Sequence, residues 1–66
     1  MSPERFAVRL RTLREARHMT QETLAKKAGV SRAYLSRLEM GRHDPPLSRL
    51  RKLARALRVN VADLLR

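Results

Sequence analysis

The sequence predicts an all-α domain of five short helices, and three observations lead to this prediction. Apolar residues recur with the 3.6-residue period of an α-helix, most clearly in the first and fourth predicted helices. Good helix-capping residues precede four of the five helices, and glycines follow two of them. The 66 residues suffice for one compact core but not for a large catalytic cavity, since a domain this small buries only about 60% of its unfolded surface. We expect the whole chain to form a single domain.

The first helix is expected over residues 3–17. Ser2 is a suitable N-cap, and the Pro3 ring fits the first turn because an N–H there would have no partner in the helix. Three apolar residues fall on one face and predict a buried stripe: Phe6, Leu10 and Leu13. The remaining surface of this helix is expected to be basic, with Arg5, Arg9, Arg11 and Arg14.

The second and third helices are expected to be short and separated by a tight turn. Thr20 caps the second helix, and Gly29 ends it because the residue after a helix often adopts the left-handed conformation. Ser31 caps the third helix, which Gly41 ends. The residues predicted to point inward from the second helix are Leu24, Ala25 and Ala28, and the third helix carries Ala33, Tyr34, Leu35 and Leu38.

Pro45 and Pro46 restart the chain into a fourth helix, and Asn60 with Asp63 forms a variant of the capping box for a short fifth helix. The fourth helix has a predicted apolar stripe of Leu47, Leu50, Leu53, Ala54 and Leu57. Its other face carries Arg49, Arg51, Lys52 and Arg55, for which a solvated helix surface is the favoured interpretation.

Two helices joined by Gly29, Val30 and Ser31 are expected to cross at a steep angle around a shared apolar contact. The residues that lock this contact are Leu24, Val30, Leu35 and Leu38. The third helix would therefore present its outward residues on a rigid element: Arg32, Ala33, Ser36 and Arg37.

The spacing of landmarks from about residue 10 to residue 65 resembles that of the Cro/C1-type (XRE) helix-turn-helix family. The matching residues are Thr20-Gln21-Glu22-Thr23-Leu24-Ala25, Gly29-Val30-Ser31, Tyr34-Leu35-Ser36-Arg37-Leu38-Glu39, Gly41-Arg42, Pro45 and Leu53-Ala54-Arg55-Ala56-Leu57. The resemblance implies a compact five-helix, lambda-repressor-like domain. It also implies that the second and third helices form the pair that reads DNA.

This resemblance assigns candidate roles residue by residue. Gln21, at the start of the second helix, would contact a phosphate through its side chain and the helix N-terminus. The third helix would lie in the major groove with Ser31, Arg32, Ala33 and Arg37 against base edges, and each arginine could donate two hydrogen bonds to a guanine. The other candidate phosphate contacts are Arg42, Arg11 and Arg14.

The resemblance further implies a salt bridge between Arg14 and Glu39, which favours a structural role for this carboxylate. Three positions depart from the family pattern. Arg58 stands where a helix-ending glycine is common, so we expect a different helix ending there. Pro46 replaces a frequent capping Ser or Thr, and Met40 replaces a frequent polar residue, which puts one backbone contact in doubt.

The charge of the chain favours an anionic partner. Sixteen Lys and Arg oppose six Asp and Glu, for a net charge of +10. Charge alone leaves nucleic acid and general solubility about equal as explanations. Thirteen of the sixteen are Arg, whose guanidinium suits phosphate and guanine, which tips the balance toward nucleic acid. The family resemblance implies that this nucleic acid is double-stranded DNA.

Other classes of site find little support. The chain has no Cys, and His18 and His43 lack nearby ligands, so neither a metal nor another cofactor is expected. Capping accounts for Thr20 and Ser31, and no paired carboxylates or activated nucleophile are present, so we do not expect an enzyme. Tyr34 could touch DNA or pack at the edge of the core. No apolar run reaches the roughly 20 residues that cross a bilayer, so we expect a soluble, cytoplasmic protein associated with the nucleoid.

The leading hypothesis is a sequence-specific transcriptional regulator that represses by occupying operator DNA. The alternative is an antitoxin or another protein-interaction module with the same fold, for which the protein partner is unknown. The apolar residues at the end of the chain are Val59, Val61, Leu64 and Leu65. They favour either a homodimer that binds a palindromic operator or closure of the core within one subunit, and the sequence leaves both open.

Overall fold

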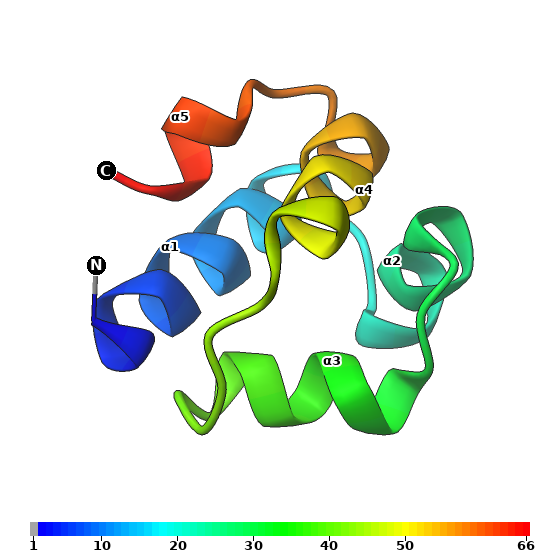
Figure 1. Cartoon of the computed structure of the whole chain (residues 1–66). Helices are drawn as coiled ribbons and strands as arrows, with labels where there is room; N and C mark the ends of the chain where they lie inside the picture. The colour runs from blue at the N-terminus through cyan, green and yellow to red at the C-terminus, as the bar shows by residue number, and fades with distance from the viewer. Residues whose placement is uncertain (1) are drawn as a thin grey trace.

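A computed structural model describes residues 2–66, so residue 1 of the expected single domain lies outside the described part. This part folds into five helices, as the sequence predicts (Figure 1). The helices are α1 (Pro3–Ala16), α2 (Gln21–Ala28), α3 (Arg32–Glu39), α4 (Leu47–Leu57) and α5 (Val61–Leu64). Within residues 2–66, no helix is both long and apolar enough to span a membrane.

The helix starts follow the local sequence. The side-chain oxygens of Ser2, Thr20 and Ser31 each accept a hydrogen bond from the backbone N–H three residues later, at 3.0–3.1 Å. Such bonds satisfy N–H groups that have no partner within the helix. At α5, the backbone N–H of Asn60 donates to Oδ2 of Asp63 at 2.9 Å. Pro46 precedes α4 as its N-cap and provides no side-chain hydrogen bond, as its substitution for Ser or Thr implies.

The end of one helix, α4, differs from the prediction. Gly29 ends α2 in the left-handed conformation with φ of 70°, as predicted. Arg58 ends α4 in the same conformation, with φ of 58°. Our expectation of a different ending at Arg58 was wrong, because the chain keeps the left-handed ending with an arginine that carries the steric cost of its Cβ.

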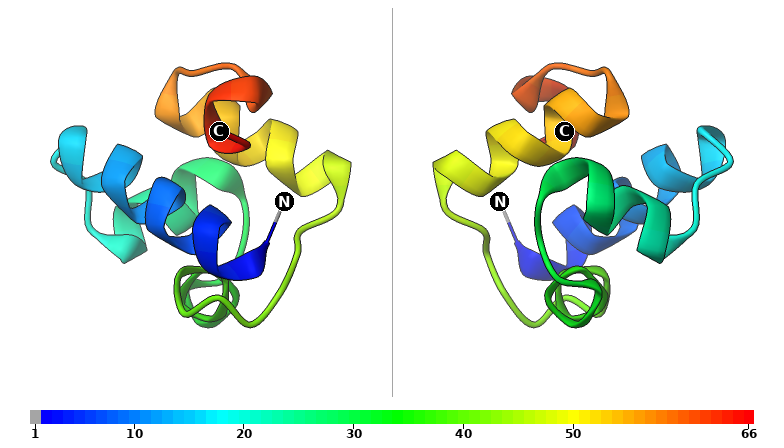
Figure 2. Two further views of the ribbon diagram at one scale, coloured as in Figure 1. Left: turned by 90° about the vertical axis from the view of Figure 1, so that its left-hand side faces the viewer. Right: turned by 90° about the vertical axis from the view of Figure 1, so that its right-hand side faces the viewer.

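One core joins all five helices. The fully buried large side chains come from every helix: Phe6, Leu10, Leu24, Leu35, Leu38, Leu53, Leu57 and Leu64. α2 packs against α3 and α4, while α1 packs against α3 and α5. α3 lies across the bottom of the view in Figure 1, and both views of Figure 2 place it at the same end of the molecule. The core therefore supports α3 from one side and leaves its outer side uncovered.

Two predicted faces need correction. Leu47 was assigned to the apolar stripe of α4 but is 53% exposed, because it lies in the first turn at the edge of that stripe. Arg14 and Arg9 were assigned to the exposed surface of α1. The Arg14 side chain is only 12% exposed because it pairs with Glu39, and the Arg9 Nε donates at 2.7 Å to the carbonyl of Asp63.

The apolar residues at the end of the chain mainly close the core of this single subunit. Leu64 is fully buried, and Val59 and Val61 pack against the core. Leu65 differs from them, since it is 41% exposed. These contacts account for three of the four residues without a second subunit, so the homodimer stays a prediction.

Candidate nucleic-acid interface

The two sides of α3 differ sharply in exposure. Leu35, Leu38 and Glu39 are buried on the inner side. The four candidate base-reading residues are all exposed: Ser31, Arg32, Ala33 and Arg37. A helix packed on its apolar side and polar on the other can enter a groove without disturbing the core.

The turn between α2 and α3 holds the two helices together. Gly29, Val30 and Ser31 form it, as the sequence predicts. The backbone N–H of Val30 donates to the carbonyl of Ala25 at 3.0 Å, and the Val30 side chain packs against the core. The start of α2 and the outer face of α3 are therefore fixed relative to each other.

A buried polar network connects α1, α2 and α3. Arg14 donates from Nε to Oε2 of Glu39 at 2.7 Å and from Nη2 to Oε1 at 3.0 Å. Its Nη1 donates to the carbonyl of Met19 at 2.7 Å. The hydrogen bonds to Glu39 and the attraction of its carboxylate raise the pKa of Arg14, although burial opposes this. The implied salt bridge is therefore present and fixes the end of α3 to the end of α1.

Glu39 also accepts a hydrogen bond that the sequence does not predict. Nε2 of Gln21, in the first turn of α2, donates to its Oε1 at 3.2 Å. The Glu39 carboxylate thus joins three helices, and its side chain is only 3% exposed. The residue types alone could not reveal this contact, because Gln21 and Glu39 are 18 residues apart and meet only through the angle between α2 and α3.

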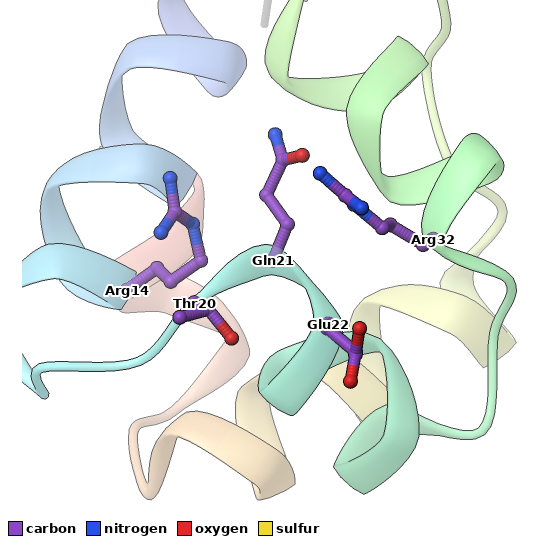
Figure 3. A pocket seen from close by; sticks show the side chains of 5 residues that line it. All are labelled: Arg14, Thr20, Gln21, Glu22 and Arg32. Atoms are coloured by element: carbon purple, nitrogen blue, oxygen red, sulfur yellow. The ribbon is translucent and has the colours of Figure 1, made fainter.

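An open depression of about 500 Å³ lies at the start of α2 (Figure 3). Its lining residues are Arg14, Thr20, Gln21, Glu22 and Arg32. The side chain of Gln21 stands between the guanidinium groups of Arg14 and Arg32. The first backbone N–H groups of α2 have no partner within the helix. Arg14 is already paired with Glu39, so the positive helix end and Arg32 oppose the carboxylate of Glu22.

The remaining candidate phosphate contacts lie outside this depression. Arg42 is exposed just after α3, where its backbone N–H donates to the carbonyl of Arg37 at 3.2 Å. Gly41 precedes it with φ of 76°, and a Cβ there would lie 3.3 Å from the Cα of Glu4. This close approach fixes the start of the loop against α1. Arg11 is exposed on α1 and does not line the depression.

Tyr34 is half-buried and contributes a contact that sequence analysis missed. The Arg49 guanidinium lies 4.3 Å from the centroid of its ring, and the His43 ring stacks on it with centroids 6.4 Å apart. Arg49 was expected to be only a solvated residue of α4. It instead forms a cation–π contact that connects α4 to α3.

Comparison with known proteins decides the family. The Helix-turn-helix family matches residues 10–64 of the chain. The chain is a Cro/C1-type helix-turn-helix protein. Family membership makes it a DNA-binding transcriptional regulator and not an enzyme.

This helix-turn-helix protein has curated relatives in bacteria and phages. It is 41% identical over 56 residues to the immunity repressor protein of Bacillus phage phi105, a match that covers 85% of this chain and 39% of the repressor. It is also 41% identical over 63 residues to the HTH-type transcriptional repressor RghR of Bacillus subtilis, covering 94% of this chain and 47% of RghR. The chain therefore spans less than half the length of either relative.

Solved structures show the same helix-turn-helix domain. The restriction-modification controller protein C.AhdI from Aeromonas hydrophila is 39% identical with a TM-score of 0.91, and the match covers 94% of both chains. A hypothetical transcription factor from Neisseria is 33% identical with a TM-score of 0.93, covering all of this chain and 76% of the other. The predicted lambda-repressor-like fold is confirmed.

Proposed function

We propose that this protein represses transcription by binding an operator half-site with α3 in the major groove. The observation that carries the proposal is the exposure of Arg32, Ala33 and Arg37 on a helix whose opposite side is buried. Arginine can donate two hydrogen bonds to O6 and N7 of guanine, and the methyl of Ala33 can contact a thymine methyl. Ser31 lies at the start of α3, within reach of the same groove.

Phosphate contacts would position α3. Gln21 and the first N–H groups of α2 face the same depression as Arg32, which suits an anionic oxygen. Arg42, exposed just beyond α3, supplies a second contact, and Arg11 a weaker third. The Arg14 guanidinium already makes three hydrogen bonds within the protein, so we assign it mainly to the support of Gln21 and Glu39.

We further propose a homodimer on a palindromic operator. Leu65 remains exposed next to the buried Leu64 and offers an apolar contact to a second copy. Two half-sites would then lie about one helical turn, roughly 34 Å, apart. Because a repressor acts where its operator is, we propose that this protein is found in the cytoplasm on the nucleoid.

Selection of bound sites from random double-stranded DNA tests the proposal. We expect enrichment of one half-site repeated with dyad symmetry. Enrichment of no sequence, together with weak binding to all DNA, would favour a protein-interaction module such as an antitoxin. Sedimentation of the protein with the selected site tests the dimer, and one copy per site at saturating protein would contradict it.

A further inference from the structure

The Glu39 carboxylate makes one hydrogen bond more than its ion pair requires. Arg14 alone contacts both carboxylate oxygens, at 2.7 and 3.0 Å, and neutralises the charge. The bond from Nε2 of Gln21, at 3.2 Å, is additional and comes from the first turn of α2. Glu39 is therefore placed to orient a side chain on the DNA-facing side of the domain.

The orientation of the Gln21 amide follows from the chemistry of its partner. An ionised carboxylate can only accept hydrogen bonds, so the nitrogen of the amide must face Glu39. The amide oxygen is then turned towards the side on which Arg32 lies, as Figure 3 shows. One N–H of Nε2 is used by Glu39, and the other is left for a further acceptor.

We propose that Glu39 is a positioning residue that holds the Gln21 amide in place for a DNA phosphate. The inference rests on the proposed DNA binding. Buried ion pairs can often be replaced by apolar residues of similar size with no loss of stability. Stability alone therefore does not account for the Arg14–Glu39 pair, and we assign it the ordering of Gln21 in addition to its link between α1 and α3.

A double-mutant cycle on DNA affinity tests this role. In the native chain, Gln21→Ala should weaken binding to the selected site about tenfold, as loss of a hydrogen bond to a charged group does. In a chain carrying Arg14→Met and Glu39→Leu, the same substitution should cost less than about twofold, because the amide is no longer held. Arg37→Ala is the matched control and should cost the same in both backgrounds. An equal cost of Gln21→Ala in both would overturn the proposal.

An NMR measurement on the native chain tests the proposal without any substitution or DNA. Gln21 is the only glutamine in the sequence, so its side-chain amide gives a single assignable pair of signals. We expect an order parameter for its Nε2 near the ~0.85 of a rigid backbone. A value below about 0.6 would show a mobile side chain and overturn the positioning role. A rigid Gln21 in a protein that binds no DNA would instead contradict the proposed function.

Discussion

The guanidinium of Arg49 lies 4.3 Å from the ring centroid of Tyr34 and thereby connects the first turn of α4 with the first turn of α3. An exposed cation–π contact contributes about 0.5–1 kcal/mol. Tyr34→Phe retains the ring face and should leave the free energy of unfolding nearly unchanged. Tyr34→Leu removes it and should cost about 1 kcal/mol in chemical denaturation. Equal stability of the two variants would show that the ring face contributes nothing.

Replacement of Arg58 by glycine should stabilise the protein. It has φ of 58°, a conformation that costs a residue with a Cβ about 1–2 kcal/mol. We expect Arg58→Gly to raise the free energy of unfolding by about 0.5–1 kcal/mol, after allowing for the greater freedom of glycine in the unfolded chain.

The matched control for Arg58→Gly is Arg55→Gly, in the last turn of α4. Arg55 is exposed and helical, so glycine there should lower stability by about 1 kcal/mol. Thermal unfolding compares the two variants. A loss of stability in both would contradict the strain assigned to Arg58.

Single substitutions in the buried Arg14–Glu39 ion pair should strongly lower the free energy of unfolding. Glu39→Ala leaves the guanidinium of Arg14 buried without its charge partner, and such losses cost about 3–5 kcal/mol. Arg66→Ala is the control, because that side chain is 72% exposed and its contact with Asp63 is 3.6 Å long. It should cost about 0–0.5 kcal/mol. If the two substitutions lowered the free energy of unfolding by similar amounts in urea denaturation, burial would not determine how much the ion pair contributes to stability.

Salt should weaken DNA binding steeply. Contacts with about five phosphates per subunit would give a slope near −4 to −5 in a plot of log affinity against log salt. Arg42→Ala should reduce the steepness by about 1 and weaken all sequences alike, as expected for a phosphate contact. If Arg42→Ala left the salt slope unchanged, or changed the preferred DNA sequence, Arg42 would not be a phosphate contact.

Local chemistry explains why so much of the fold was predictable. Ser2, Thr20 and Ser31 cap helices through hydrogen bonds to residues only three positions away. At position 29, glycine itself indicates the left-handed backbone conformation that the structure shows. Arg58 misled because its left-handed conformation accompanies the backbone hydrogen bonds that end α4, such as that from Val59 N–H to the Ala54 carbonyl at 2.9 Å, and its residue type does not indicate it. The contacts between helices could not be predicted from the sequence either, since the Gln21–Glu39 hydrogen bond and the Tyr34–Arg49 contact depend on the angles between helices.

We propose above that α3 reads DNA through Arg32 and Arg37. The most direct measurement is the ratio of affinities for the selected site and for random DNA, in the native chain and in the Arg32→Ala, Arg37→Ala variant. Each lost guanine contact costs about 1–3 kcal/mol of discrimination, so the ratio should fall at least about 30-fold while circular dichroism shows an intact fold. An unchanged ratio in the folded variant would show that Arg32 and Arg37 do not read the DNA sequence.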